Sequence, residues 1–302
     1  MFDSQNLESL TVQLNRAIGD QDKVVQYING FKKLHIKILL PDINSSMYDF
    51  TISRDGLRWG LGAIKFVSKH FAETIINNRI ANGPFKDISD FDKRIDLGYF
   101  DPLEINAIIM AGAFDTLHNN RRDLLDAIQG KSLFKDIPSI KYYGNNPKYN
   151  DHDILYLEKK LFGLYISGHP LDHYKDLINS TKTKTTKSLS NCRENFFIIG
   201  IPRFYKLLFS TRTKRFKKAE GVLEDLYGVV PFIISSQTMN IYFENYENNS
   251  SWDKIMVAKA NIMKVNDKSP NNINNTSMLN ITEFYSIEDA AIILNHYKKK
   301  CC

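Results

Sequence analysis

The stretch LEKKLFGLYISGHPLDHY, from Leu157 to Tyr174, decides how this chain divides into folded parts. A charged, amphipathic run approaches Gly163 and predicts a helix that ends there, because glycine accepts the backbone angles that close a helix. A short apolar piece follows, and the turn Gly168-His169-Pro170 then fixes the direction of the chain. The stretch therefore predicts a helix that closes into a rigid turn.

The composition is that of a globular protein with two or three compact units. The 302 residues are 43% hydrophobic and 25% charged, and no apolar run approaches the ~20 residues that a membrane helix needs. The N-terminus lacks the basic flank and apolar centre of a secretory signal. The three cysteines, Cys192, Cys301 and Cys302, have no zinc-site spacing. We therefore expect an intracellular protein with no metal site and no membrane partner.

The first half of the chain has a helical pattern. Asp20 is expected to cap one helix, and Asp101-Pro102 predicts the start of another, with Asp as the cap and Pro in the first turn. Between them, Gly83-Pro84 interrupts the pattern. One apolar stripe has helical spacing and consists of Val67, Phe71, Ile75, Ile76 and Ile80. Short helices joined by tight turns are typical of helical hairpins.

The second half of the chain is rich in β-branched and aromatic residues, which predicts strands. Five are expected, at Phe196 to Ser210, Ala219 to Leu226, Gly228 to Ser235, Lys254 to Val265 and Met278 to Ile281. A helical connection is expected near Thr238 to Tyr246. The predicted fold class is therefore α+β multidomain, with a domain of helical hairpins followed by a five-stranded OB-fold β-barrel.

Basic residues are concentrated at the start of this strand-rich half. Between Thr181 and Val230 there are eleven Lys and Arg residues against four Asp and Glu residues. Such an excess indicates a polyanionic partner. The alternative is a solvated basic surface without a ligand.

Six motifs follow one another in a recognisable order: DKVVQYINGFKKLHIKILLPDIN (Asp22 to Asn44), LRWGLGAIK (Leu57 to Lys65), GPFKDISDF (Gly83 to Phe91), MAGAFDTL (Met110 to Leu117), the Gly163 to Pro170 run and GVLEDLYG (Gly221 to Gly228). In this order they resemble the C-terminal portion of the bacterial DNA polymerase III alpha subunit. The resemblance implies the end of the fingers region, a tandem helix-hairpin-helix domain and an OB domain.

The resemblance also implies domain boundaries. A remnant of the fingers region is expected at 1–50, the tandem helix-hairpin-helix domain at 51–128 and a linker at 129–153. A helix and the Gly-His-Pro turn form a connector at 154–186. The OB-fold domain follows at 187–284, and a C-terminal helix and tail at 285–302.

The polymerase site of that family lies in a palm domain upstream of every matched motif, where paired Asp residues hold two Mg²⁺ ions. No segment of this chain corresponds to it. Asp90 and Asp92 flank Phe91, and we interpret them as a helix-start cap and surface charge rather than metal ligands. We therefore expect no catalytic residue, no metal ligand and no cofactor in this chain, and a separate chain that supplies the palm.

The resemblance to helix-hairpin-helix domains suggests one nucleic-acid surface. In such domains two glycines let the backbone approach a DNA phosphate at a helix N-terminus. The family pattern places these glycines where this chain has Phe66 and Ser68, and Asp101 and Glu104 occupy the second hairpin. Both departures weaken phosphate binding and favour a retained helical core. Lys65, Lys69 and Lys93 remain candidate phosphate contacts.

A second nucleic-acid surface is expected on the barrel, because OB-folds stack bases on aromatic residues along a basic groove. The candidate contacts alternate cations and rings and are Arg203, Tyr205, Lys206, Arg212, Lys214, Arg215, Phe216, Lys217 and Lys218. Tyr205 and Phe216 are the expected stacking residues. In the alternative interpretation, Phe204 and Phe209 belong to the core and the cations only solvate a loop.

Two further features have competing interpretations. Gln129, Leu133 and Phe134 resemble the sliding-clamp-binding peptide of the family, although Gln129 is displaced by one residue; the alternative is a linker that packs on its own domain. His169 and His173 are four residues apart, but the intervening Pro170 favours a structural role for His169 in the turn over a metal site.

The sequence thus predicts an accessory part of a replicative polymerase. It would bind single-stranded or primed DNA and the sliding clamp, together with other replisome subunits, in the bacterial cytoplasm at the nucleoid. One alternative is an interaction scaffold whose DNA-binding surfaces have decayed. A weaker alternative is an OB-fold RNA binder of the synthetase anticodon type.

Overall fold

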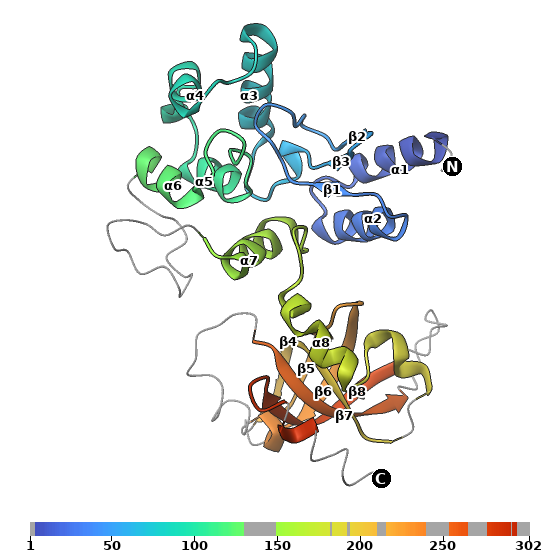
Figure 1. Cartoon of the computed structure of the whole chain (residues 1–302). Coiled ribbons are helices and arrows are strands. Elements are labelled where there is room, and N and C mark those ends of the chain that lie inside the picture. The colour runs from blue at the N-terminus through green and yellow to red at the C-terminus, as the bar shows by residue number, and fades with distance from the viewer. Residues whose placement is uncertain are drawn as a thin grey trace. The chain divides into compact units, whose positions relative to one another are not determined.

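A computed structural model shows two compact units, Met1–Gly168 and His169–Cys302 (Figure 1). The structure describes residues 4–129, 149–181, 183–191, 194–209, 216–239, 254–264, 277–290 and 292–294. Helices dominate the first unit and strands the second, so the predicted α+β class is confirmed.

The first unit begins with two helices and a small sheet. The helices are α1 (Ser4–Arg16) and α2 (Gln21–Lys33), and the strands are β1 (Ile38–Leu39), β2 (Thr51–Ser53) and β3 (Gly56–Arg58). Asp20 caps α2 as predicted, because its carboxylate accepts the N–H of Lys23. In the sheet β3 is central, parallel to β1 and antiparallel to β2.

Short helical segments complete the first unit, in the order η1 (Leu61–Ala63), α3 (Lys69–Asn82), α4 (Ile88–Arg94), η2 (Leu97–Tyr99), α5 (Pro102–Met110), α6 (Arg121–Gln129) and α7 (Asp151–Phe162). Polar side chains cap their N-termini: Ser68 caps α3, Asp87 caps α4 and Asp101 caps α5. Asp101 forms a capping box with Glu104, which confirms the predicted Asp-Pro helix start.

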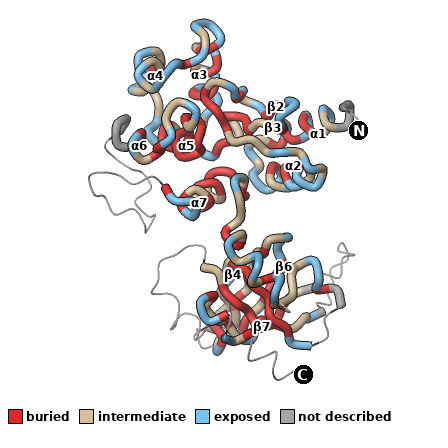
Figure 2. Tube along the Cα trace, in the orientation of Figure 1, coloured by how far each residue is buried: buried red, intermediate tan, exposed pale blue. Residues whose placement is uncertain are grey.

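The core of the first unit is built around aromatic rings and α5. Trp59 is fully buried, with ring centroids 4.9 Å from Phe50 and 4.6 Å from Phe162. After its first turn, α5 is buried from Ile105 to Met110, and Figure 2 shows this part of the helix in red. Within the predicted stripe of α3, Phe71, Ile75 and Ile76 are buried. Ile80, in the same stripe, is 67% exposed, because the last turn of α3 extends beyond the core.

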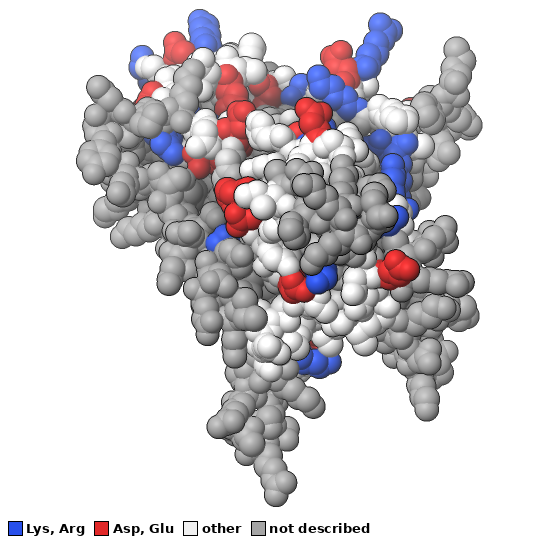
Figure 3. All heavy atoms as spheres, turned by 60° about the horizontal axis from the view of Figure 1, so that its bottom comes forward, with Lys and Arg blue, Asp and Glu red and all other residues white. Residues whose placement is uncertain are grey.

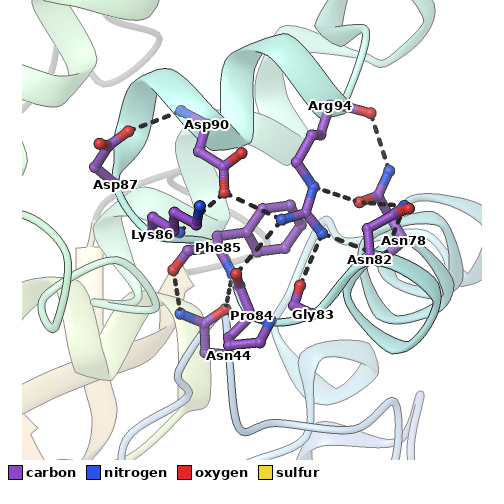
Figure 4. A network of polar contacts seen from close by, with 10 residues as sticks. All are labelled: Asn44, Asn78, Asn82, Gly83, Pro84, Phe85, Lys86, Asp87, Asp90 and Arg94. Carbon is purple, nitrogen blue, oxygen red and sulfur yellow. Dashed lines mark hydrogen bonds and ion pairs between the residues drawn. The ribbon is translucent and has the colours of Figure 1, made fainter.

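The GPFKDISDF motif (Gly83 to Phe91) forms the loop before α4 and the first turn of that helix, and several hydrogen bonds hold it (Figure 4). The carboxamide of Asn44 both donates to and accepts from the backbone of Phe85, each at 2.8 Å. The Arg94 guanidinium lies 4.3 Å from the Phe85 ring centroid and donates to the Gly83 carbonyl and to Asp90. These contacts explain the motif as a structural element.

Asp90 does not cap a helix, contrary to the prediction, because Asp87 occupies the cap position. The Lys86 N–H donates to Asp90 at 3.0 Å, and this bond, with the Arg94 ion pair, holds the pKa of Asp90 below its ordinary value. Asp92 is exposed, as expected of a surface charge.

The stretch that ends in Gly168 closes the first unit. Gly163 ends α7 with a φ of +77°, a left-handed conformation that suits glycine. The buried Glu158 carboxylate accepts the N–H groups of Ile166 and Ser167, at 2.6 and 3.0 Å. Lys32 donates to the Tyr165 carbonyl, and burial lowers the pKa of this lysine although the Glu158 charge opposes the shift. The predicted helix and turn are therefore present, and a buried carboxylate holds the turn.

The second unit starts with η3 (Pro170–Tyr174), α8 (Lys175–Ser180) and η4 (Thr186–Asn191). His169 caps η3: its Nδ1 accepts the Leu171 N–H at 3.1 Å, and its own N–H donates to Asp172. This is the structural role that the sequence predicts for His169.

The five predicted strands form a closed barrel with the order β4-β5-β6-β8-β7. They are β4 (Phe196–Phe209), β5 (Phe216–Glu224), β6 (Val229–Ser235), β7 (Met256–Lys264) and β8 (Ser277–Ser286). Neighbouring pairs are antiparallel except β6 and β8, which are parallel. Helical backbone at 236–239 agrees with the start of the expected connection between the third and fourth strands.

The GVLEDLYG motif forms the end of β5 and the turn that leads into β6. A Cβ on Gly221 would lie 2.4 Å from the Arg203 carbonyl oxygen, so a larger residue would force β4 and β5 apart. The buried Asp225 carboxylate accepts the N–H groups of Tyr227 and Gly228 in the turn and that of Thr186 in η4. The motif thus fixes both the strand pair and its connection to η4.

Candidate nucleic-acid interface

The loop before α3 is the first candidate surface. It runs from Ile64 to Ser68, and the Lys65 N–H donates to the Leu161 carbonyl at the end of α7. Phe66 has a φ of +73°, a conformation that favours glycine. The backbone at Phe66 therefore keeps a glycine-like conformation although a large side chain is present.

The start of α3 already holds an anionic group. The Ser68 N–H donates to Oε1 of Glu104 at 2.8 Å, while Oε2 of the same carboxylate accepts the Asp101 N–H. A phosphate at this helix start would have to displace Glu104 and would meet its negative charge. From the sequence, the acids of the second hairpin are expected to repel phosphate at that hairpin. The structure shows that one of them, Glu104, also accepts the Ser68 N–H of the first hairpin.

Cations and rings alternate on the surface around this loop. The Lys65 ammonium lies 5.0 Å from the Phe66 ring centroid, and the Lys69 ammonium lies 5.9 Å from that of Tyr48. His70, next in the chain, packs against Phe100 with ring centroids 5.5 Å apart. Lys65, Phe66 and Lys69 are all exposed. We call the set Tyr48, Lys65, Phe66, Lys69 and His70 the hairpin strip.

The charge of the hairpin strip is only partly balanced. Lys69 lies 3.6 Å from the Glu73 carboxylate, and both side chains are at least half exposed. An ion pair of this kind is weak in water, so Lys69 can exchange Glu73 for a phosphate at little cost. Lys93, the other candidate of this unit, is exposed in the last turn of α4.

The barrel is the second candidate surface, and its described cations are engaged by acids. Arg203 pairs with Glu224 at 3.0 Å. Lys206 and Lys218 both face Glu220, at 3.8 and 3.0 Å. The register places Lys206 directly opposite Glu220 across β4 and β5, which makes the pairing a consequence of the strand alignment. These contacts reduce the positive charge of the predicted groove.

The aromatic residues of the predicted groove divide into two groups. Phe204 packs inside the barrel, with its ring centroid 5.4 Å from Phe232, which supports the alternative that it belongs to the core. Tyr205, Phe216 and Lys217 lie in strands whose side chains at these positions fall outside the description. Arg212, Lys214 and Arg215 lie outside the described residues, so their predicted roles remain predictions.

The clamp-binding prediction falls at the edge of the described chain. Gln129 is the last residue of α6, and its side chain is not described. Leu133 and Phe134 lie outside the described residues.

Charges of both signs are mixed on the surface. On the face drawn in Figure 3, the described Lys and Arg side chains are interspersed with Asp and Glu side chains. Among the described residues, no group of three or more His, Cys, Asp or Glu could hold a metal ion. No helix in the described ranges is long and apolar enough to cross a membrane.

The part of the first unit that holds these features is similar to helix-hairpin-helix proteins. The family model described as "Helix-hairpin-helix motif" matches residues 35–124, which include the hairpin strip and both acidic helix starts.

The whole chain has wider relationships. It is 28% identical over 263 residues to the DNA polymerase III subunit alpha of Borreliella burgdorferi, a match that covers 79% of this chain and 22% of that protein. For Campylobacter jejuni the identity is 30% over 245 residues, covering 70% and 20%, and for Vibrio cholerae it is 27% over 282 residues, covering 84% and 24%. This chain is therefore related to a part of the DNA polymerase III alpha subunit, and the resemblance read from the six motifs is confirmed.

The matched part is a minor share of those proteins, because the chain spans about a fifth to a quarter of the length of the curated relatives. Solved structures give a weaker likeness. An aspartyl-tRNA synthetase from Entamoeba histolytica matches 39% of this chain with 12% identity and a TM-score of 0.25. A score this low defines neither fold nor function.

Sequence reasoning named Glu104 and Phe66 but missed their contacts and conformation, and it did not name Tyr48 or His70 of the hairpin strip. Glu104 contacts Ser68 across 36 residues of chain, and nothing local in the sequence reveals that contact. Phe66 was interpreted only as an obstruction to phosphate. Phe66 stands next to Lys65 at a position where the family pattern has glycine. That position is the sequence signal that predicts a positive φ and an exposed ring.

Proposed function

We propose that this chain is a DNA-holding part of a replicative DNA polymerase III alpha subunit. The observation that carries the proposal is the hairpin strip, where exposed Lys65 and Lys69 flank a loop inside the region that the helix-hairpin-helix model matches. Two ammonium groups beside aromatic rings suit the phosphate backbone and the bases of a nucleic acid.

The proposed contacts are mainly ionic. Because Glu104 occupies the Ser68 N–H, the lysine side chains replace the backbone donors that a glycine loop would present. Each phosphate that a lysine neutralises releases counterions from the DNA. The affinity should therefore fall steeply as the salt concentration rises.

We propose the barrel as a second DNA contact and assign it to the OB-fold class. The closed order β4-β5-β6-β8-β7 with one parallel pair supports this assignment. Since Arg203, Lys206 and Lys218 are paired with acids, the binding residues of the barrel would be those around the β4–β5 connection: Arg212, Lys214, Arg215, Phe216 and Lys217.

The chemical step is assigned to another polypeptide segment. The resemblance places the metal-binding Asp pair in a palm domain upstream of the matched motifs, so no step of nucleotide transfer is derived for this chain. The proposal needs no cofactor on this chain. Its partners would be DNA, a chain that carries the palm and other replisome subunits, at the nucleoid in the cytoplasm.

We also propose sliding-clamp binding through Gln129, Leu133 and Phe134, on the resemblance of this segment to clamp-binding peptides. Replacing Leu133 and Phe134 together by Ala should abolish co-elution of the chain with a bacterial sliding clamp. Unchanged co-elution would contradict this part of the proposal.

The main proposal is tested by fluorescence anisotropy with single-stranded and primed DNA over a series of salt concentrations. We expect binding whose logarithm falls linearly with the logarithm of the salt concentration. No binding, or a slope near zero, would contradict the proposal and favour the interaction scaffold.

A further inference from the structure

A pocket of about 310 Å³ lies beside the hairpin strip. Three separate segments of the first unit form it, namely the α1–α2 connection with the start of α2, the loop from Gly62 to Val67 and the end of α7. Its apolar lining includes Val24, Ile64 and Phe162. Phe66 and Lys65 belong to the same lining, so the exposed ring and its neighbouring cation border a cavity rather than open solvent.

The conformation of Phe66 is costly for its sequence. The left-handed region is unfavourable for a non-glycine residue, because its Cβ crowds the backbone. Burial of the ring offsets this cost incompletely, because Phe66 remains 39% exposed. Strained residues of this kind cluster at ligand sites, where the strain holds a side chain in a functional position.

The lining matches the chemistry of a nucleobase. The Lys65 ammonium lies over the Phe66 ring, whose exposed part offers an aromatic surface for stacking, and apolar side chains form much of the remaining lining. The Gln21 carboxamide also lines the pocket and can both donate to and accept from the edge of a base. Lys65 lies within reach of the phosphate that adjoins a base held in this position.

We propose that this pocket accepts one unpaired nucleobase of bound DNA, stacked on Phe66, with Lys65 on the neighbouring phosphate. The inference rests on the proposed DNA binding and adds a base-binding site to it. The pocket favours single-stranded or primer-template junction DNA over continuous duplex, because only an unpaired base can enter.

The test uses the full chain and a single-stranded oligonucleotide that carries one 2-aminopurine, whose fluorescence is quenched by stacking. Phe66→Gly removes the ring and suits the observed φ, so this variant is expected to fold. Phe66→Tyr retains an aromatic face. Tyr227→Ala is the matched control, because Tyr227 has the same kind of cation contact, with Lys187 4.7 Å from its ring centroid, but lines no pocket described above.

We expect Phe66→Gly to weaken single-strand binding roughly tenfold, within the ~5- to 150-fold range of one stacked base. It should also abolish the quenching and leave binding to a blunt duplex unchanged. Phe66→Tyr and Tyr227→Ala should behave as the wild type.

Unchanged quenching in Phe66→Gly, or equal weakening of single-strand and duplex binding, would overturn the base pocket while leaving DNA binding intact. If the wild-type chain binds neither DNA, the proposed function fails and the base pocket with it.

Discussion

The two units differ in how the cations of their candidate DNA surfaces are paired. In the first unit, Met1–Gly168 (the hairpin unit), the charged residues Glu158 and Arg79 are buried and hold loops together. Lys65 and Lys69 of the same unit are exposed beside aromatic rings. In the second unit, His169–Cys302 (the barrel unit), the described cations of β4 and β5 pair with Glu220 and Glu224, whereas Lys187 in η4 is exposed over the Tyr227 ring.

This difference shows that a basic segment is not the same as a basic surface. In the segment with the largest excess of Lys and Arg, the described cations of β4 and β5, namely Arg203, Lys206 and Lys218, are paired with Glu224 or Glu220. The hairpin segment is less basic in sequence but exposes its lysines next to aromatic rings. We therefore expect buried charges to affect mainly the free energy of unfolding and paired surface charges to affect mainly DNA affinity.

The largest effect is expected for Arg79→Met in the hairpin unit. Arg79 is 7% exposed and donates to the carbonyls of Ile43 and Ser46, so the variant leaves two buried acceptors without this donor. We expect the free energy of unfolding to fall by about 3 kcal/mol. Urea denaturation measures it.

Lys218→Ala in the barrel is the matched control for Arg79→Met. Its ion pair is partly exposed, and the loss should stay below about 1 kcal/mol. Equal losses of the free energy of unfolding in the two variants would contradict the claim that buried charges matter more for stability than paired surface charges.

A smaller effect is expected for Glu220→Gln in the barrel. The substitution releases Lys206 and Lys218 from their shared acid, so DNA affinity at low salt should rise by a factor of about three to ten. Anisotropy titration measures the change, with Glu283→Gln, which pairs with Lys259 on β7, as the control. An unchanged affinity for Glu220→Gln would show that pairing does not suppress binding by the barrel.

Glu104→Gln should have a still smaller effect. The carboxamide oxygen can still accept the N–H of either Ser68 or Asp101, although not both, and the negative charge at the start of α3 is gone. We expect DNA affinity to rise about two- to fivefold, the size of one helix-terminus charge. Asp55→Asn, an exposed acid in the β2–β3 turn, is the control. A fall in affinity would mean that Glu104 positions the loop rather than repelling DNA.

The smallest effect is the pH dependence of the Asp90 contact in the hairpin unit. Because the Lys86 N–H and Arg94 lower the pKa of Asp90 in the folded state, this carboxylate stabilises the fold above its ordinary pKa. The contribution is lost as the pH falls through the lower, folded-state value. Urea midpoints measured between about pH 5 and pH 2 should therefore depend on pH less in Asp90→Asn than in the wild type. Identical profiles would contradict the assignment.

Local signals in the sequence predict much of the fold. Asp20 and Asp101-Pro102 mark helix starts, and all five barrel strands are found near their predicted positions. Strand ends are less predictable, because pairing sets them: β8 extends to Ser286 rather than Ile281, since it continues to pair with β7 as far as Met256.

The candidate site is predicted less well, because its decisive contacts join residues that are distant in sequence. Lys65 and Lys69 could be named from a motif, but the Glu104 contact depends on how α3 and α5 pack. The pairing of Lys206 with Glu220 depends on the register of β4 and β5, which a bulge at Tyr205 shifts. The exposure of Ile80 likewise follows from where the helix leaves the core, which the 3.6-residue period does not encode.

The central claim is that lysines of the hairpin unit make the main ionic contacts with the DNA phosphates. The most direct measurement compares the salt dependence of DNA binding by two double variants, Lys65→Ala with Lys69→Ala and Lys206→Ala with Lys218→Ala. We predict that the hairpin pair lowers the slope of log affinity against log salt by about 1.4 to 1.8, two phosphate contacts, while the barrel pair leaves it nearly unchanged. A lower slope in the barrel pair and an unchanged slope in the hairpin pair would contradict the account.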